Sequence, residues 1–498
     1  MSSDRKEKKE RPVKPLSLFA ALLPIIALIV FMSVAVLVYG ADPHIPLLLG
    51  TIVVAIVGLI HGFTWKDLEK SMIDSIASAL DAILILTLMG PLVASWIISG
   101  TVPAMVYYGL EIINPSFFLV TSCALCCIVS LACGSSWTTA ATVGIALMGI
   151  GNGLGINPAM TAGSVISGAY FGDRLSPLSD FTNLTSGVTG VNLFEHIRHM
   201  IFTSVPALVV SLILYIIVGL RYTPDSVDLS IVNSMRETLA ANYNINPFLL
   251  IPPLLIGLMV VFKVPAIPGL IGGIALGIVF FLGFQGGAEH GIKEAIGIMI
   301  DALNNGVVTT TGDPYIDNLL TRGGIQGMMW TVSLILCALS YGGMLDKIGS
   351  LRVLSGYMLK LVKNTGSLVL VTIVSCIFTN AVTGDVYLSV MLPGRMYKDE
   401  YDRQGLATKN LSRALEDGGC VSSSLFPWNS CGAYMSSTLG VNSFLYAPYA
   451  FVNLLTPVVS IIFAFTGITM TKMTPEERAE AAKRLAEKAE ESLETSNK

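Results

Sequence analysis

The chain has 498 residues, of which 53% are hydrophobic, and it carries 30 Lys or Arg and 34 Asp or Glu side chains. Residues 1–14 hold 9 of these charges and residues 472–498 hold 13, so residues 15–471 are only about 9% charged, against roughly 25% in an ordinary soluble domain. This composition excludes secreted disulfide scaffolds, disordered chains and cytosolic enzymes, because a soluble fold would expose large apolar patches. It indicates a polytopic all-α membrane protein in contact with the lipid bilayer, and no basic stripe points to nucleic acid as a partner.

Apolar segments long enough to cross about 30 Å of hydrocarbon as helices occur along most of the chain. In chain order, the predicted spans are 15–39, 45–63, 71–99, 197–220, 247–264, 266–283, 323–347 and 443–468. Two other regions, 114–192 and 364–442, are apolar but rich in Gly, Ser, Thr, Asn and Asp. They predict helices with unwound stretches, which persist at membrane depth only where they line a cavity or are buried in protein.

The two interrupted regions resemble each other in sequence. An ungapped shift of 250 residues aligns 114–194 with 364–444, and thirteen of the 81 aligned pairs are identical. Most of the matches are Gly, Pro or Asn, among them Gly134/Gly384, Gly155/Gly405, Pro177/Pro427, Gly190/Gly440 and Asn192/Asn442. Because Gly and Pro fix breaks in the backbone, the matches predict two structural repeats. A fainter echo relates Met72-Ile73-Asp74 to Met299-Ile300-Asp301.

The basic residues predict that the two repeats are inverted. Residues 347–413 contain nine Lys or Arg, whereas the equivalent stretch 97–163 contains none. Since cytoplasmic loops collect Lys and Arg, equivalent loops face opposite sides, if 115–150 and 366–397 form re-entrant hairpins. The predicted organisation is a cytoplasmic head (1–14), a first repeat (15–220), an extracytoplasmic linker (221–246), a second repeat (247–471) and a charged cytoplasmic tail (472–498).

An inverted repeat with broken helices is the general plan of secondary transporters, whose sites lie near the membrane midplane between the repeats. The breaks fall at 134–139 and 172–183 in the first copy, and at 383–385 and 416–432 in the second. Unwinding frees backbone carbonyls, which are hard oxygen ligands suited to Na⁺, and exposes half-helix N-termini that favour anions. A desolvated carboxylate there would bind either the cation or a proton.

Acidic residues inside the membrane are functional candidates, because their charge costs about 2.5–3.5 kcal/mol at the bilayer centre. A single Ser or Thr more often bonds to its own helix. The predicted cation and proton ligands are Asp180, Asp173, Asn183, Thr182, Ser135, Ser136, Asp417, Asn429, Ser430 and Asp385. Asp180 and Asp173 lead, with Na⁺ expected at Asp180, Asn183 and Asn429. Arg174 either neutralises Asp173 or holds a substrate carboxylate. No cofactor is expected beyond transported Na⁺ and H⁺.

Two long motifs carry a resemblance to a known family. Phe171-Gly-Asp-Arg-Leu-Ser-Pro-Leu-Ser-Asp180 with Leu193–His199, and Glu416-Asp-Gly418 with Phe426–Met435, resemble the NhaC family of bacterial Na⁺/H⁺ antiporters. Phe181 departs from the pattern, which has a small hydroxylated residue there. The resemblance implies re-entrant hairpins in inverted repeats, a homodimer and a bacterial cell membrane. It also implies either Na⁺/H⁺ exchange or Na⁺-coupled antiport of a small carboxylate such as malate or lactate.

Na⁺/H⁺ antiport by alternating access is the function these features favour, and the small-carboxylate antiporter is the alternative. A passive ion channel is a rival of another class. An intramembrane enzyme is the least favoured, because the chain has five histidines and neither an HExxH nor a GxSxG motif.

Overall fold

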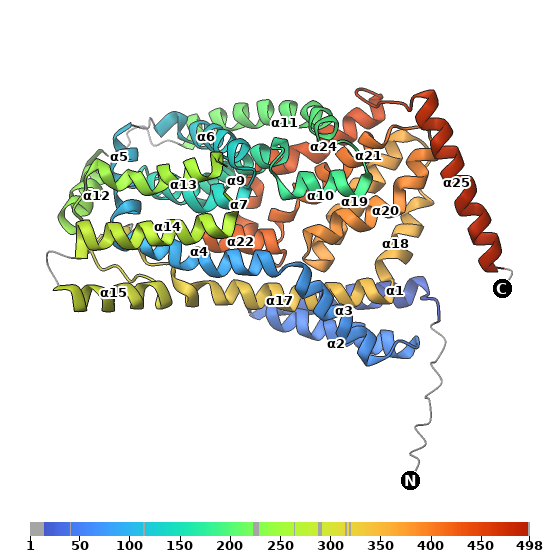
Figure 1. The fold of residues 1–498 in the computed structure, drawn as a ribbon, viewed down its shortest axis with the longest axis horizontal. Helices are drawn as coiled ribbons and strands as arrows, with labels where there is room; N and C mark the ends of the chain where they lie inside the picture. The colour runs from blue at the N-terminus through green and yellow to red at the C-terminus, as the bar shows by residue number, and fades with distance from the viewer. Residues whose placement is uncertain are drawn as a thin grey trace, which may run out of the picture.

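The computed structural model describes residues 14–39, 41–112, 115–222, 229–262, 264–286, 291–313, 316–317 and 320–496. Within these residues every regular element is a helix, and pairing between extended segments is limited to one bridge between Leu406 and Lys472. Helices α4, α11, α14 and α17 run along the long axis of the molecule (Figure 1). The predicted all-α fold with broken helices is confirmed.

The helices are arranged in two runs along the chain. The first run contains α1 (Leu18–Ser33), η1 (Val34–Val38), α2 (His44–Ile60), α3 (Trp65–Ser78), α4 (Leu80–Ile98), α5 (Thr101–Ile112), η2 (Pro115–Phe117), α6 (Phe118–Cys133), α7 (Ser136–Thr139), η3 (Ala140–Gly144), α8 (Ile145–Gly153), α9 (Pro158–Leu175), α10 (Asp180–Thr189) and α11 (Leu193–Tyr222). The second contains α12 (Leu229–Asn242), η4 (Pro247–Leu250), α13 (Ile251–Val261), α14 (Ala266–Phe280), η5 (Phe281–Gly286), α15 (Gly291–Asn305), α17 (Gly324–Ile348), α18 (Ser350–Leu359), α19 (Thr365–Thr383), α20 (Val386–Arg403), α21 (Thr408–Leu415), η6 (Glu416–Cys420), η7 (Ser423–Leu425), α22 (Ser430–Leu439), α23 (Ser443–Tyr446), η8 (Ala447–Tyr449), α24 (Phe451–Thr466) and α25 (Pro475–Ser496).

Three of the four long apolar helices fall where the hydropathy pattern predicts spans, whereas the fourth, Thr365–Thr383, lies in the region that was predicted to be interrupted. Within the described ranges, four helices are long and apolar enough to cross a membrane alone, and up to seven spans result when each bent pair counts as one. Two expectations differ in detail, because neither 71–99 nor 443–468 is one straight helix. In 443–468, Ser443–Tyr449 and Phe451–Thr466 are bent by 58°. Ala79 leaves helical geometry (φ −110°, ψ 10°) and separates α3 from α4, and the two axes are bent by 44°.

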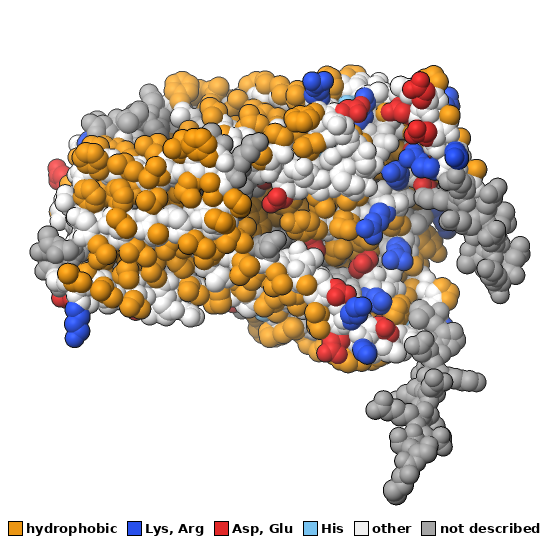
Figure 2. Space-filling model, in the orientation of Figure 1, with side chains coloured by type: hydrophobic (Ala, Val, Ile, Leu, Met, Phe, Trp, Pro, Cys, Tyr) orange, Lys and Arg blue, Asp and Glu red, His pale blue; other side chains and the backbone are white. Residues whose placement is uncertain are grey.

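The surface of the molecule is divided between an apolar body and a charged end. Figure 2 shows hydrophobic side chains over most of the visible face, whereas most Lys, Arg, Asp and Glu gather where Figure 1 places α18, α20 and α25. Large apolar side chains such as Leu254, Ile271 and Val279 are more than half exposed. A surface of this kind is stable only against lipid, so the apolar body is the membrane-embedded part.

The repeat seen in the sequence recurs in the backbone. Glycines with left-handed φ angles end equivalent helices at Gly134 and Gly384 (both 68°), Gly155 and Gly405 (71° and 65°), and Gly190 and Gly440 (79° and 71°). The shift of 250 residues also relates both ends of α10 to those of α22. The same shift therefore describes both the sequence and the positions of the helix breaks.

Equivalent helices of the two copies run in opposite directions where they touch. In the middle of α4, the backbone of Gly90 lies against that of Gly324 at the start of α17, while Ser71 and Ser75 of α3 lie against Gly343 near the end of α17. The α3–α4 pair is therefore antiparallel to α17, which is the equivalent of α4. The fainter echo also fits, since the echoed residues place α15 before α17 as α3 precedes α4.

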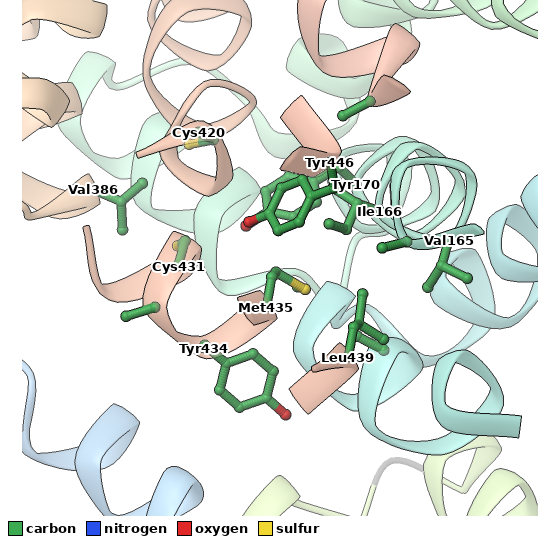
Figure 3. Close-up of a cluster of buried hydrophobic side chains, with 14 of the residues drawn as sticks. Val165, Ile166, Tyr170, Val386, Cys420, Cys431, Tyr434, Met435, Leu439 and Tyr446 are labelled. Carbon is green, nitrogen blue, oxygen red and sulfur yellow. The ribbon is translucent and has the colours of Figure 1, made fainter. Parts of the chain in front are cut away.

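The two broken helices pack against each other through an apolar core. Figure 3 shows Val165, Ile166 and Tyr170 of α9 facing the side chains of α22, including Met435 and Leu439. All five side chains are buried. This contact brings together segments that are more than 260 residues apart in the chain, and it places both helix breaks in the interior.

Candidate ion-binding site

The two hairpin tips turn in the same way. In the first copy, Gly134 ends α6 and Ser135 caps α7, its Oγ accepting a hydrogen bond from the N–H of Thr138 (3.2 Å). In the second copy, Gly384 ends α19 and Asp385 caps α20, its Oδ1 accepting from the N–H of Tyr387 (2.7 Å). A left-handed glycine followed by a capping oxygen thus reverses the chain in each copy.

The broken helices are also built alike. Between α9 and α10 the chain unwinds at Pro177, and the Ser179 hydroxyl caps α10 by accepting from the N–H of Thr182 (3.3 Å). The equivalent unwound stretch at Pro427 leads to Asn429, whose Oδ1 caps α22 by accepting from the N–H of Cys431 (3.0 Å). The predicted interruptions at 172–183 and 416–432 therefore occur as helix breaks.

Each hairpin tip packs against the helix break of its own copy. A Cβ atom on Gly134 would lie 2.6 Å from the Cβ of Leu178, and one on Gly384 would lie 2.8 Å from the carbonyl oxygen of Trp428. Leu178 and Trp428 are themselves related by the shift of 250 residues. Glycine is therefore required at both positions for two reasons: the turn is left-handed, and the helix break of the same copy approaches the glycine backbone closely.

Each hairpin tip also touches the broken helix of the other copy. The Trp137 ring stacks on Tyr434 of α22 with centroids 4.1 Å apart, and the Tyr434 hydroxyl donates to the Trp137 carbonyl (3.0 Å). In the reverse direction, Tyr387 of the second hairpin lies 6.2 Å from the Phe181 ring of α10. The four breaks consequently surround one space between the copies.

That space is a cavity of about 330 Å³. It is lined by Ala79, Ile85, Gly134, Ser135, Trp137, Thr138, Asp173, Asp180, Phe181, Asp385, Val386, Tyr387 and Ser430. Two shift-related pairs each contribute one carboxylate and one hydroxyl, namely Ser135 with Asp385 and Ser430 with Asp180. Three carboxylates from both copies thus face one chamber, whose wall also contains apolar and aromatic side chains.

Five of the predicted ligands lie at this cavity, namely Asp173, Asp180, Asp385, Ser135 and Ser430. Asp173 and Asp385 are almost fully buried, at 4% and 3% exposure, whereas Asp180 is exposed. Asp173 Oδ2 accepts a hydrogen bond from the N–H of Ser136 (2.9 Å), so this carboxylate joins the broken helix to the hairpin tip. Ser136 contributes its backbone and does not line the cavity.

The remaining polar candidates of the broken helices hold the unwound backbone. Thr182 Oγ1 donates to the Arg174 carbonyl (3.1 Å), and the Asn183 amide donates to the carbonyls of Pro177 (3.0 Å) and Ser179 (2.8 Å). The Asn429 amide donates to Asn380 Oδ1 (2.9 Å). Of the three residues at which Na⁺ was expected, only Asp180 lines the cavity, because both asparagines serve the helix breaks.

Arg174 adopts an arrangement different from both of those expected. Its guanidinium pairs with the carboxylate of Asp417 in the second copy, and Thr203 Oγ1 donates to the same Oδ1 (3.1 Å). Both members of the pair are buried, and neither lines the cavity. Asp417 is thus placed in an ion pair that joins the copies, outside the cavity.

Glu416 is a buried acid that is not among the ligands predicted from the sequence, although its neighbour Asp417 is. Its Oε2 accepts a hydrogen bond from Thr185 Oγ1 of α10 (2.7 Å) and lies 4.0 Å from His196 Nε2 of α11. The sequence signal was available, because Glu416 stands in the same glycine-rich break as Asp417. Trp137 and Tyr387 of the cavity wall were also missed, since aromatic residues in apolar helices are common.

Taken together, the fold and the cavity define a multi-pass membrane transporter. Discontinuous helices that meet around a chamber lined by carboxylates, at the junction of two related halves, are the structural plan of secondary transporters.

Sequence comparison identifies the particular family. A model of the Na⁺/H⁺ antiporter family matches residues 168–468. A protein named Na⁺/H⁺ antiporter NhaC from Alkalihalophilus pseudofirmus is 40% identical over 452 residues, which cover 91% of this chain and 96% of that protein. The chain therefore belongs to the Na⁺/H⁺ antiporter (NhaC) family, as the two long motifs predict.

Relatives at similar identity carry other names. The arginine/ornithine antiporter ArcD of Halobacterium salinarum is 39% identical over 477 residues, covering 94% of this chain and 96% of that protein. The malate-2H⁺/Na⁺-lactate antiporter of Bacillus subtilis is 37% identical over 413 residues, covering 83% and 86%. The chain is therefore a secondary antiporter and not an enzyme, while its relatives exchange different substrates.

Proposed function

We propose that the protein exchanges Na⁺ for H⁺ by alternating access, with the cavity between the two copies as the shared cation and proton site. The observation that carries this proposal is the convergence of Asp173, Asp180 and Asp385 on one chamber formed by four helix breaks. A buried carboxylate without a matching positive charge is stable only when it binds a cation or a proton. Competition between the two at one site is sufficient to couple their movements.

The buried carboxylates are held in place by backbone groups. Asp173 and Asp385 each use an oxygen to accept an N–H at the start of a hairpin helix, from Ser136 and Tyr387 respectively. Asp173 Oδ1 is buried and makes no hydrogen bond among the described residues, so it is available to a ligand. Within the described ranges, no three Asp, Glu, His or Cys side chains are close enough to hold a metal ion. Na⁺ would therefore draw on Ser135, Ser430 and carbonyl oxygens as well.

Alternating access would follow from inverted repeats. The left-handed glycines that recur every 250 residues and the antiparallel packing of α3–α4 against α17 support this topology. We propose repeats at 15–220 and 247–471, joined by a linker at 221–246, with re-entrant hairpins at 115–150 and 366–397. The start of α1 and the C-terminal α25 lie at the same, charged end (Figure 1), which we assign to the cytoplasm together with the head (1–14) and tail (472–498).

We propose a bacterial cell membrane as the location, and a homodimer whose interface is formed by the long apolar helices outside the hairpins. Mass measurement of the protein in lipid nanodiscs would test the dimer, and a monomer at all concentrations would contradict it.

A second candidate is Na⁺-coupled antiport of a small carboxylate. The volume of the cavity favours it, because about 330 Å³ lies within the range of small-molecule sites and exceeds what one cation fills. The aromatic walls at Trp137, Phe181 and Tyr387 would suit an organic molecule. Arg174 is bound to Asp417, so in this conformation the carboxylate would have to be held by other groups.

The test is proton flux in vesicles that contain the purified protein, under separate Na⁺, K⁺ and malate gradients. Na⁺/H⁺ antiport predicts that a Na⁺ gradient alone moves protons, and that Asp173→Asn and Asp180→Asn each abolish the movement. Exchange that requires malate would establish the second candidate instead. Full Na⁺-driven exchange in both variants would remove the cavity from the mechanism.

A further inference from the structure

A second buried polar cluster lies between the two copies, outside the cavity. It is formed by Arg174, Thr185, His196 and Thr203 from the first copy and by Glu416 and Asp417 from the second. All six side chains are buried, and none lines the cavity. The exchange of Na⁺ for H⁺ proposed above assigns no role to this cluster.

Of the two acids in the cluster, Glu416 is the one that is hydrogen-bonded only by neutral groups, because Asp417 pairs with Arg174. Its side chain has no exposed surface. Oε2 accepts from Thr185 Oγ1 (2.7 Å) and from Cys420 Sγ (3.4 Å), while Oε1 is buried without a hydrogen bond among the described residues. An ionised carboxylate in this position would lack most of the compensation that a buried charge requires.

The positive charge of Arg174, which lies near Glu416, is already paired with another carboxylate. Arg174 forms an ion pair with Asp417, whose Oδ1 also accepts from Thr203. His196 Nδ1 is bonded to Ser412 Oγ (2.9 Å), which leaves Nε2 buried, without a hydrogen bond, and 4.0 Å from Glu416 Oε2. One proton, residing on either the carboxyl group or the imidazole, would neutralise this pair.

The other groups around Glu416 do not supply a counter-charge. Apart from Arg174, whose positive charge is paired with Asp417, the ionisable side chains that act on Glu416 are Asp173 of α9 and Cys420 of its own turn, besides His196 of α11. Helices α19 and α24 also pack on this segment, and they bond to its backbone through the neutral amides of Asn380 and Asn453. Helix α20 meets it through Ser389 and Val390.

The position of Glu416 connects it to the parts that must move. Residues Glu416–Cys420 form a π-helical turn, a form of helix that is frequent at functional sites. Figure 3 shows Cys420 of this turn in the apolar region beside α22. The Thr185 bond joins the turn to α10, and α10 begins at the cavity residue Asp180. A change in the charge of Glu416 would therefore alter a contact between the copies.

We propose that Glu416, paired with His196, is a second proton-binding site, separate from the cavity, which carries one additional proton in each transport cycle. The inference rests on the proposed Na⁺/H⁺ exchange and deepens it. In one half-cycle the Glu416 carboxylate takes up a proton on the side where Na⁺ is released, and in the other half-cycle it releases that proton on the side where Na⁺ binds. The cation and the first proton remain at the cavity.

The test compares two fluxes in the same vesicles, radioactive Na⁺ uptake and proton movement from an enclosed pH indicator, in wild type and Glu416→Gln. Glutamine keeps the size and the acceptor oxygen of a protonated glutamate but cannot release a proton. We expect Na⁺ uptake to continue while the number of protons moved per Na⁺ falls by one. Glu416→Asp, which can titrate, should restore the wild-type ratio.

A matched control is Glu195→Gln, which removes an exposed acid that pairs with Lys409 and should leave both fluxes unchanged. An unchanged proton-to-Na⁺ ratio in Glu416→Gln would overturn the inference, because Glu416 would then hold its proton permanently. Loss of both fluxes in Glu416→Gln and Glu416→Asp, in protein that still elutes as a single species, would overturn it in favour of a structural role. No Na⁺-driven proton movement in the wild type would instead overturn the proposed exchange itself.

Discussion

The two hairpin tips share one backbone and differ in the side chain that caps it. Gly134 and Gly384 turn with the same φ of 68°, but the residue that follows is Ser135 in the first copy and Asp385 in the second. At the broken helices the difference is reversed, with Asp180 in the first copy and Ser430 in the second. The repeated backbone thus builds a symmetric chamber, while its carboxylates are distributed asymmetrically over the two copies.

This comparison indicates which residues determine the backbone around the chamber and which supply the groups that would bind ions. Residues that fix the backbone, such as the glycines, are the same in both copies because both copies need the same break. The carboxylate and hydroxyl side chains that face the cavity differ between equivalent positions, because one chamber needs only one set of charges. Substitutions at equivalent positions in the two copies can therefore separate the two kinds of role.

The largest expected effect concerns the ion pair between the copies. Asp417→Asn leaves the Arg174 guanidinium buried without a counter-charge, which should lower the free energy of unfolding by about 3–5 kcal/mol. Lys409→Gln breaks the more exposed pair with Glu195 and should cost only about 0–1 kcal/mol. Thermal unfolding of both variants in detergent measures the difference, and equal losses would contradict a structural role for the buried pair.

The next effect concerns the hairpin glycines. Gly134→Ala and Gly384→Ala each force a Cβ into a left-handed position, at about 1–2 kcal/mol, and into contacts below 3 Å with the neighbouring break. Both variants should lose transport activity, and their free energies of unfolding should fall by similar amounts. Gly187→Ala in α10 is the control, because that site has open space and no positive φ. A variant at Gly384 alone that transports normally would argue against equivalent tips.

Exchanging the capping residues tests the asymmetry directly. Asp385→Ser removes one ligand charge and should reduce apparent Na⁺ affinity by about ten- to hundredfold, as expected for a lost charged contact of about 1.5–3 kcal/mol. The double variant Ser135→Asp with Asp385→Ser returns a carboxylate to the equivalent tip and should recover part of the affinity. Na⁺ dependence of transport measures both. No recovery would mean that the two tips are not equivalent at the cation.

The smallest effect is expected at the aromatic contacts. Trp137 stacks closely on Tyr434, whereas Phe181 and Tyr387 are 6.2 Å apart and tilted. Trp137→Leu should therefore cost more stability than Phe181→Leu, with the aromatic contribution of each pair at about 0.5–1.5 kcal/mol. Denaturation of the two variants in the same detergent gives the order, and the opposite order would contradict the contact geometry.

The helix breaks could be predicted from sequence because their causes are local. Gly134 and Pro177 determine the backbone within a few residues, and their recurrence at Gly384 and Pro427 doubles the signal. The same reasoning placed Asp173, Asp180 and Asp385 near the breaks, and the cavity does gather them. The presence of charged residues at the helix breaks can thus be predicted from a single sequence.

Side-chain partners that depend on packing between the copies could not be predicted. Arg174 and Asp417 are 243 residues apart, and their pairing depends on how α9 lies against η6. Asn183 and Asn429 were expected to bind Na⁺, yet the Asn183 amide donates to the unwound backbone and the Asn429 amide donates to the side chain of Asn380 in α19. Nothing in the sequence fixes the direction of a side chain at a helix break. The bend at Ala79 was missed for a related reason, because no Gly or Pro marks it.

The central claim is that Na⁺ and H⁺ compete for the cavity carboxylates, and proton release on Na⁺ addition tests it most directly. The purified protein in weakly buffered detergent is mixed with NaCl or, as a control, choline chloride, and the pH change is recorded. The wild type should release protons with Na⁺ but not with choline, and the double variant Asp173→Asn with Asp180→Asn should release none. Equal release by the double variant, or no release by the wild type, would contradict the account.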